Sequence, residues 1–232
     1  MTDDFKPALL IVDLQEDFCP PNGSLAVTNG RDIIPLVNKL LELPFVVKIA
    51  TKDWHPRDHI SFASNHAGKQ AFSDSVEIVN PYNASESYSS RLWPVHCVQG
   101  TAGAELAGEL HTGKIDVVLD KGTDARVEMY SPFYDPFRAP RVYDSGLAGA
   151  LRARGVTDVY VVGLAADYCV RHAAVDAAKE GFRTYLVEDG TRAVDAAAWP
   201  DCKRDIEAGG AKVVSVDAPE VRRLMMAAAE AP

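Results

Sequence analysis

Short apolar runs alternate with helix-like patterns along most of this chain. The runs are apolar throughout rather than at every second position, which indicates strands buried on both faces, as in a parallel sheet. We expect six such strands, at Ala8–Val12, Phe45–Thr51, Ile115–Leu119, Val159–Val162, Thr184–Val187 and Lys212–Val216. Apolar spacing of helical period predicts helices at Arg31–Leu41, Ala104–Leu110, Tyr143–Ala153, Asp167–Lys179, Asp195–Ala208 and Pro219–Ala229. The alternation predicts an α/β fold, a three-layer α/β/α sandwich around a six-stranded, mainly parallel sheet.

One long stretch, residues 54–98, breaks this alternation and shows neither period. We interpret it as an irregular insertion in the second crossover, and loops of such length are usually functional. Its Ser-, Asn- and Tyr-rich middle, Asn83–Ser90, is either a mobile flap or a plain insertion. The length of 232 residues suits one domain spanning 1–232.

Charge and termini exclude several classes of partner. Asp and Glu outnumber Lys and Arg by 33 to 24, a net charge of −9, and no basic run stands out. Nucleic acid and anionic membranes are therefore not expected partners. The acidic start MTDDFKPALLIVD is unlike a secretory signal, and no apolar stretch could span a bilayer. We expect an intracellular protein, cytoplasmic or nuclear, with its four scattered cysteines reduced.

Polar side chains follow the first four predicted strands where each strand ends. Asp13 follows the first, Asp53 and His55 the second, Lys121 the third and Cys169 the fourth. In open parallel sheets the carboxyl ends of the strands meet at one edge, where ligands bind. We therefore expect these side chains to form one site.

The chemistry of this set centres on Cys169. It falls in the first turn of a predicted helix, with Asp167 as a candidate N-cap, and a helix N-terminus favours a thiolate. Asp13 could take the thiol proton, and Lys121 could lower the pKa of both groups. The competing interpretation is that Cys169 is a small buried apolar residue, which free cysteines usually are.

The segment Asp53-Trp54-His55 indicates a metal site. Side chains two residues apart in extended backbone point to the same side, and a carboxylate with an imidazole suits a divalent transition metal. A third ligand is needed, and His59 and His96 are the candidates.

Five segments together resemble a known family, the isochorismatase-like cysteine hydrolases, and within it the nicotinamidases. The segments are LIVDLQEDFCPPNGSLAV (10–27), TKDWHPRDHISFASNH (51–66), LWPVHCVQGTAGAEL (92–106), DKGTDARVEMYSPF (120–133) and GLAADYCVRHAAVDA (163–177). The resemblance implies a Rossmann-like topology and hydrolysis of nicotinamide, and of pyrazinamide, in NAD salvage. It also implies one divalent metal ion, for which we expect zinc. It does not specify an oligomeric state, and homo-oligomers are left open.

The resemblance also implies a role for each matching residue. Cys169 would be the nucleophile, Asp13 the general base and acid, and Lys121 the third member of the triad. The metal would lie on Asp53, His55 and His96, with His59 an optional further ligand. A cis Leu164–Ala165 peptide would let the N–H groups of Ala165 and Cys169 form an oxyanion hole. Aromatic side chains would line the substrate pocket, namely Phe18, Trp93, Tyr130 and Tyr168.

Two other functions fit the same residues. One is a related hydrolase acting on a ureido, carbamoyl or enol-ether substrate, which the metal motif disfavours. The other is a non-enzymatic protein in which Cys169 is a redox-sensing thiol. Release of ammonia from nicotinamide distinguishes the three.

Overall fold

The computed structural model describes residues 5–229, so the first four and last three residues of the expected domain lie outside the described part. A six-stranded sheet forms its centre, in the order β5-β2-β1-β6-β7-β8, and every pairing is parallel. The strands are β1 (Pro7–Val12), β2 (Val47–Asp53), β5 (Val117–Lys121), β6 (Asp158–Leu164), β7 (Arg183–Arg192) and β8 (Lys212–Val214). The predicted six-stranded parallel sheet is therefore confirmed, with ends shifted by up to five residues.

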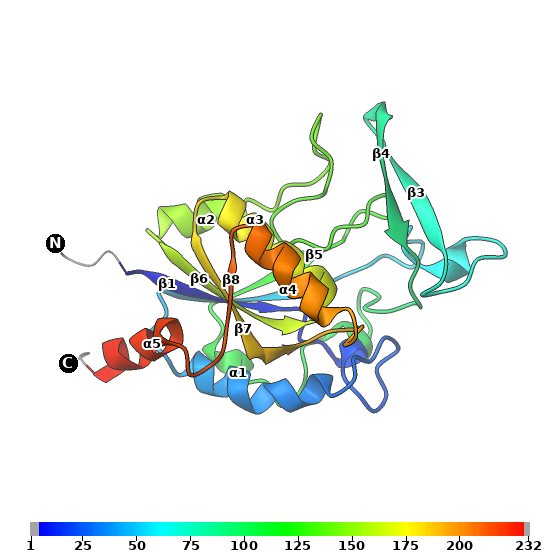
Figure 1. The fold of residues 1–232 in the computed structure, drawn as a ribbon. Helices are drawn as coiled ribbons and strands as arrows, with labels where there is room; N and C mark the ends of the chain where they lie inside the picture. The colour runs from blue at the N-terminus through cyan, green and yellow to red at the C-terminus, as the bar shows by residue number, and fades with distance from the viewer. Residues whose placement is uncertain (1–4, 230–232) are drawn as a thin grey trace.

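Helices cover both faces of the sheet, as Figure 1 shows with the sheet between two helical layers. One layer holds α1 (Ile34–Leu41) and α5 (Pro219–Ala229), and the other α2 (Leu147–Ala153), α3 (Arg171–Lys179) and α4 (Trp199–Ala208). Alternate residues of β1 serve the two layers: Leu9 and Ile11 pack towards α1, while Leu10 and Val12 pack towards α2 and α3. This is the side-chain alternation of a strand buried on both faces.

Four predicted helices begin later than expected. A 3-10 turn, Gly30–Ile33, precedes α1, and α2 starts only after Gly146, whose φ of 73° is outside the helical region. Before α4, the Asp195 carboxylate accepts hydrogen bonds from the N–H groups of Ala197 and Ala198. The fourth, α3, follows a π-helical turn at Ala166–Val170.

The helix predicted at Ala104–Leu110 is wrong. The segment has only a 3-10 turn at Ala102–Ala104 and then runs extended beside the end of β1. Its backbone groups are used there, since Glu16 N–H donates to Glu105 and Ala107 N–H donates to Leu14, both at 2.9 Å. Pairing with a distant segment has outweighed the local preference for helix.

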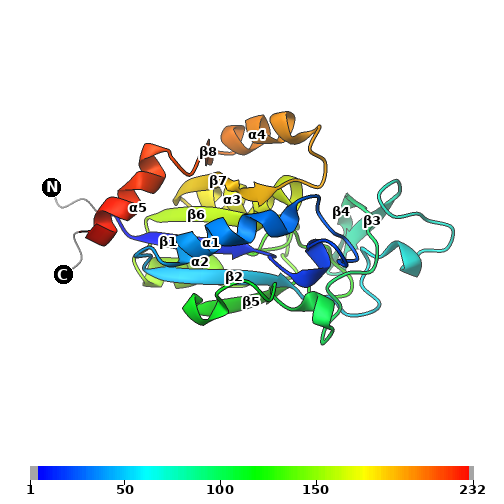
Figure 2. The same cartoon turned by 90° about the horizontal axis from the view of Figure 1, so that it is seen from below.

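The predicted irregular insertion contains an antiparallel hairpin, β3 (Ser75–Asn80) and β4 (Asn83–Arg91). It stands at the carboxyl end of the sheet, outside the two helical layers (Figures 1 and 2). Ile78 of β3 is buried in a small cluster with Val127 and Phe137, which fixes the hairpin to the 120–145 segment. Asn83–Ser90 is thus a strand. No helix of the described residues is long and apolar enough to cross a bilayer.

Candidate active site and metal centre

Three of the predicted residues, Asp13, Lys121 and Cys169, lie together at the carboxyl end of the sheet, with the Lys121 ammonium between the other two. Its Nζ lies 3.0 Å from Asp13 Oδ2 and 3.4 Å from Cys169 Sγ. All three side chains are at most 5 % exposed. The parallel sheet causes this meeting, since Asp13 follows β1, Lys121 ends β5 and Cys169 follows β6.

Asp13 is held by its own strand end and by a neighbouring strand. Its φ is 49°, in the left-handed region that few residues other than glycine adopt. Thr51 on β2 fixes this geometry, because its hydroxyl donates to Asp13 Oδ1 at 2.6 Å and accepts from the Asp13 N–H at 3.1 Å. Strained backbone of this kind often marks a functional site.

Burial decides the protonation of this trio. Burial raises the pKa of Asp13 above its ordinary value, although Lys121 opposes this. Burial likewise raises the pKa of the Cys169 thiol well above its usual range, again against Lys121. Burial therefore opposes the thiolate that a helix N-terminus would favour, and Asp13 is the adjacent candidate base.

The turn that carries Cys169 also differs from expectation in two details. The Leu164–Ala165 peptide is not cis, since the cis bonds within residues 5–229 are Pro20–Pro21 and Ala139–Pro140. A trans bond here avoids a cost of about 3 kcal/mol, and the Ala165 carbonyl accepts hydrogen bonds from the N–H groups of Tyr168 and Val170. Asp167 does not cap the helix either, because its carboxylate accepts from the N–H groups of Val194 and Asp195.

Asp53, His55 and His96 form a second cluster, and their ligand atoms all lie within 4.8 Å of one another. Asp53 Oδ2 is 3.5 Å from His55 Nε2 and 3.8 Å from His96 Nε2. Each ring holds its Nδ1 against a carbonyl, that of Gly122 at 2.8 Å for His55 and that of Pro94 at 2.7 Å for His96. Both Nδ1 atoms therefore donate a proton, and both Nε2 lone pairs face the carboxylate.

This arrangement fits a cation. His55 Nε2 is buried and has no hydrogen-bond partner, so its lone pair is unsatisfied. Burial lowers the pKa of His55, but Asp53 outweighs that effect and the net shift is upward, which shows the pull of this site on a proton. Two imidazoles and a carboxylate are a donor set for a divalent transition metal. The residues present a candidate metal site.

His59 lies beside this cluster but has both nitrogens engaged. Its Nδ1 is 2.8 Å from Ser61 Oγ and its Nε2 is 3.1 Å from the Val127 carbonyl. The ring stacks on His55 with centroids 4.0 Å apart. His59 therefore packs against the His55 ring, and neither of its nitrogens is free to bind a metal.

Lys121 joins the two clusters. Its Nζ contacts Asp53 Oδ1 at 2.5 Å, while Asp53 Oδ2 faces the two histidines. Burial alone would raise the pKa of Asp53, but Lys121 and His55 hold it well below its usual range. Asp53 is therefore ionised and shared between the lysine and the candidate metal site.

A narrow cavity of about 20 Å³ opens onto both clusters. The four predicted aromatic residues line it together with Asp53, His96, Ala165 and Cys169. Sequence reasoning missed three further lining residues, Leu25, Glu128 and Val194. Glu128 is 3 % exposed, and burial raises the pKa of its carboxyl group. Nothing in the periodicity of DARVEM distinguishes it, because only the fold brings that loop to the site.

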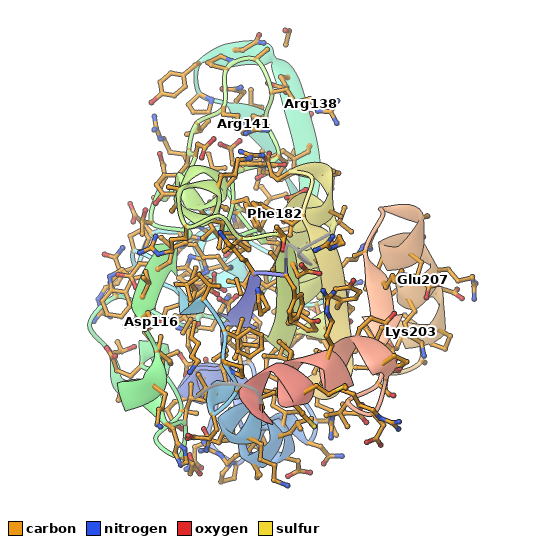
Figure 3. The ribbon with its side chains drawn as sticks, turned by 90° about the vertical axis from the view of Figure 1, so that its left-hand side faces the viewer. Asp116, Arg138, Arg141, Phe182, Lys203 and Glu207 are labelled. Atoms are coloured by element: carbon orange, nitrogen blue, oxygen red, sulfur yellow. The ribbon has the colours of Figure 1, made fainter. Side chains whose placement is uncertain are left out.

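A larger cavity, of about 410 Å³, lies on the other side of Tyr130. His172 lines it and stacks on Tyr130, with centroids 5.4 Å apart. Arg138 and Arg141 border it beside the hairpin, at the end of the molecule that is uppermost in Figure 3. Tyr130 thus lines both cavities.

Comparison with known proteins gives consistent matches. The isochorismatase domain model matches residues 7–218. A nicotinamidase of Acinetobacter baylyi is 43% identical over 81% of this chain and 82% of its own length. The yeast nicotinamidase bound to the inhibitor nicotinaldehyde superposes with a TM-score of 0.84 at 31% identity, covering 90% of this chain and 99% of that one. A pyrazinamidase of Pyrococcus horikoshii in complex with zinc gives a TM-score of 0.67 at 33% identity, covering 90% and 99%.

Proposed function

Since this chain belongs to the isochorismatase family, we propose that its buried cysteine site hydrolyses nicotinamide to nicotinate and ammonia. The protein is a nicotinamidase, an enzyme of NAD salvage, and its similarity to nicotinamidases extends over most of the chain. The observation that carries the mechanism is the position of Lys121 Nζ, within 3.4 Å of Cys169 Sγ and 3.0 Å of Asp13 Oδ2. These contacts support Cys169 as the nucleophile and Asp13 as the base, both beside the Lys121 cation.

In the first half of the reaction, Asp13 takes the proton of the Cys169 thiol. The raised pKa of Asp13 makes it a better proton acceptor than an ordinary aspartate, and the resulting thiolate stays beside the Lys121 ammonium. The sulfur attacks the carboxamide carbon, and the backbone N–H of Cys169 would stabilise the oxyanion; the Ala165 N–H, whose expected role required a cis Leu164–Ala165 peptide, is not assigned to it. Collapse of this intermediate, with a proton from Asp13, releases ammonia and leaves a thioester.

In the second half, Asp13 takes a proton from water, and the hydroxide formed attacks the thioester carbon. The carboxylic acid leaves, and the sulfur regains the proton. Lys121 keeps its charge throughout. Burial disfavours that charge, but Asp13 and Asp53 outweigh it and raise the pKa of the ammonium well above its ordinary range.

We also propose that Asp53, His55 and His96 hold one divalent ion, with zinc as the expected metal. The fit rests on the unsatisfied His55 Nε2 and on the two Nε2 lone pairs that face Asp53 Oδ2. A bound ion would supply positive charge to orient a polar ring atom of the substrate. Phe18, Trp93, Tyr130 and Tyr168 would enclose the flat ring itself.

Ammonia release from nicotinamide tests the mechanism. Cys169→Ala should reduce it to background, because a methyl group cannot form the thioester. Cys202→Ala is the matched control, since Cys202 is also a buried free thiol but lies on α4, away from the site. Wild-type turnover by Cys169→Ala would refute the assignment.

The substrate series nicotinamide, pyrazinamide and benzamide tests whether the proposed metal site contacts the ring nitrogen of the substrate. All three carry the same amide, and only benzamide lacks a ring nitrogen. A site that engages a polar atom can lose up to about 10⁴-fold in kcat/KM when the atom is missing. We expect good hydrolysis of nicotinamide, measurable hydrolysis of pyrazinamide and very poor hydrolysis of benzamide. Equal kcat/KM for benzamide and nicotinamide would mean that the metal cluster does not contact the substrate ring.

A further inference from the structure

The carboxyl-terminal end of the hairpin strand β4 contacts the aromatic wall of the substrate pocket. Ser90 Oγ is 3.2 Å from the Tyr130 hydroxyl, which also accepts a hydrogen bond from Trp93 Nε1 at 3.0 Å. Trp93 donates to the Tyr130 hydroxyl, and either hydroxyl can be the donor in the contact between Tyr130 and Ser90. The hydroxyl is satisfied within the wall.

Arg91, the last residue of β4, binds a second wall residue. Its Nη1 donates to the Tyr168 hydroxyl at 2.9 Å. The Tyr168 ring meets the Trp93 ring edge to face, with centroids 4.7 Å apart at 88°. The Arg91 guanidinium also lies 5.8 Å from the Trp93 ring centroid. Arg91 therefore fixes the outer end of Tyr168, while Trp93 supports its ring.

A third contact ties the same strand to the acidic side of the pocket. Tyr88 donates its hydroxyl to the Glu128 carbonyl at 2.6 Å and accepts from the Glu128 N–H at 3.1 Å. Tyr88 and Ser90 lie on one face of β4, because side chains alternate along a strand. Ser87 lies on the opposite face, where its hydroxyl donates to Glu77 of β3 at 2.7 Å. Tyr88 and Ser90 thus contact the pocket wall from one face of β4, while Arg91, on the face of Ser87, reaches Tyr168 from the last position of the strand.

We propose that the end of β4 is a specificity element of the enzyme and that Arg91 is a positioning residue that fixes Tyr168 across the pocket. This inference rests on the proposed nicotinamidase function. The cavity is narrow and four of its lining side chains are aromatic, so displacements of its wall change which rings fit. Phe18 and Trp93 are buried, whereas Tyr130 and Tyr168 are partly exposed. The Tyr130 hydroxyl is bonded to Trp93 and Ser90, whereas the Tyr168 hydroxyl is bonded to Arg91, so the position of Tyr168 depends on Arg91.

Removing the Arg91 hydrogen bond tests the proposal. Arg91→Ala should raise KM for nicotinamide about 5-fold and leave kcat within about twofold, the effect expected for loss of one hydrogen bond that preorganises binding. The triad is untouched, since Arg91 contacts none of its members. Tyr168→Phe removes the same bond from the other side and should raise KM by a similar factor. The double variant should be no worse than either single one, because all three lack the same bond.

Two further variants serve as controls. Arg91→Lys keeps a cationic donor and should restore part of the affinity. Ser87→Ala removes a hydrogen bond of the same strand that goes to Glu77 of β3 and not to the pocket wall, so its kcat and KM should match those of the wild type.

A bicyclic substrate tests specificity directly. Quinoline-3-carboxamide has the nicotinamide ring and amide with a second fused ring, which the narrow wild-type pocket should exclude. A looser wall in Arg91→Ala should lower the ratio of kcat/KM for nicotinamide to that for the bicyclic amide by about 10-fold, through loss of the small substrate and gain of the large one.

The proposal is overturned if Arg91→Ala leaves KM unchanged, if it lowers kcat alone, or if its effect adds to that of Tyr168→Phe. It is also overturned if Ser87→Ala has the same effect as Arg91→Ala, since the strand would then act only through its stability. Failure of the proposed function would look different: wild-type protein would release no ammonia. The wall contact would then be tested by the indole N–H resonance of Trp93, which should shift in Arg91→Ala and not in Ser87→Ala.

Discussion

His172 should make the stability of this protein depend on pH in a way that one substitution removes. The side chain packs on Tyr130 at the edge of the larger cavity. Burial lowers its pKa to about 4; Asp176 opposes this shift, and Arg171, Lys179 and Lys121 reinforce it. The other ionisable side chains that line this cavity are those of Tyr130, Tyr134, Asp135, Arg138 and Arg141. An unfolded histidine has a pKa of about 6.5, so the unfolded chain binds the proton first.

The sign follows from this order of pKa values. Between about pH 6.5 and pH 4 the unfolded state holds more protons at this position than the folded state, so stability falls as the pH falls. Above about pH 7 the position contributes no pH dependence. At pH 5 the His172 contribution to the free energy of unfolding is about 2 kcal/mol lower than at pH 8. Each pH unit below about 6.5 lowers it by about 1.4 kcal/mol, and about 1.5 units lie between pH 6.5 and pH 5.

Urea unfolding of wild type and His172→Phe at pH 8 and pH 5 measures this term. Carboxyl groups titrate equally in both proteins, so the difference between the two free energies of unfolding isolates His172. That difference should move by about 2 kcal/mol in favour of the variant at pH 5. The adjoining cavity of about 410 Å³ gives the phenyl ring room. His172→Gln should show the same movement. Parallel pH dependences for wild type and both variants would refute the reasoning.

Three further predictions follow from the site and its strands. Thr51→Val removes the hydroxyl that fixes Asp13 and should lower kcat about 10-fold with little change in KM, measured by ammonia release. Gly163→Ala should destabilise the fold by more than about 3 kcal/mol or prevent soluble expression, because a Cβ would lie 2.0 Å from the Val12 carbonyl oxygen and φ is 125°. Metal analysis of the Asp53→Ala, His96→Ala double variant should show little bound metal, and full occupancy would exclude the candidate site.

The sheet and the polar residues at its carboxyl end could be predicted from the sequence because both depend on local signals. Apolar runs identify the strands, and a parallel sheet then brings the polar residues at their ends together. Asp53 and Lys121 are an example, since they are register partners at the ends of the neighbouring strands β2 and β5. The metal cluster was predictable for the same reason, with His96 added by the resemblance.

The remaining parts of the site depend on contacts between distant segments. Thr51 lies within an apolar-looking strand, and nothing local shows that its hydroxyl bonds to Asp13. The hairpin was missed because β4, NASESYSSR, has almost no apolar residues and is stabilised by pairing with β3 and by contacts around Ile78. The opposing effect of burial on the Cys169 thiol was not visible, because a sequence shows the helix N-terminus but not the desolvation that raises the pKa.

Lys121 makes the triad and the metal cluster one electrostatic unit. The two oxygens of Asp53 divide between them: Oδ1 contacts the lysine at 2.5 Å and Oδ2 faces the histidines. A substitution such as Lys121→Met would leave Asp13 and Asp53 as two buried carboxylates without their shared cation, and one of them would have to take up a proton. If that carboxylate is Asp13, the base is lost; if it is Asp53, the metal site loses its charged ligand. Lys121→Met should therefore abolish ammonia release, with metal binding retained if Asp13 takes up the proton and weakened if Asp53 does, whereas Cys169→Ala should abolish ammonia release and leave metal binding unchanged. Metal content and activity measured on both variants distinguish the two cases, and a Lys121→Met protein that releases ammonia at the wild-type rate would refute the reasoning.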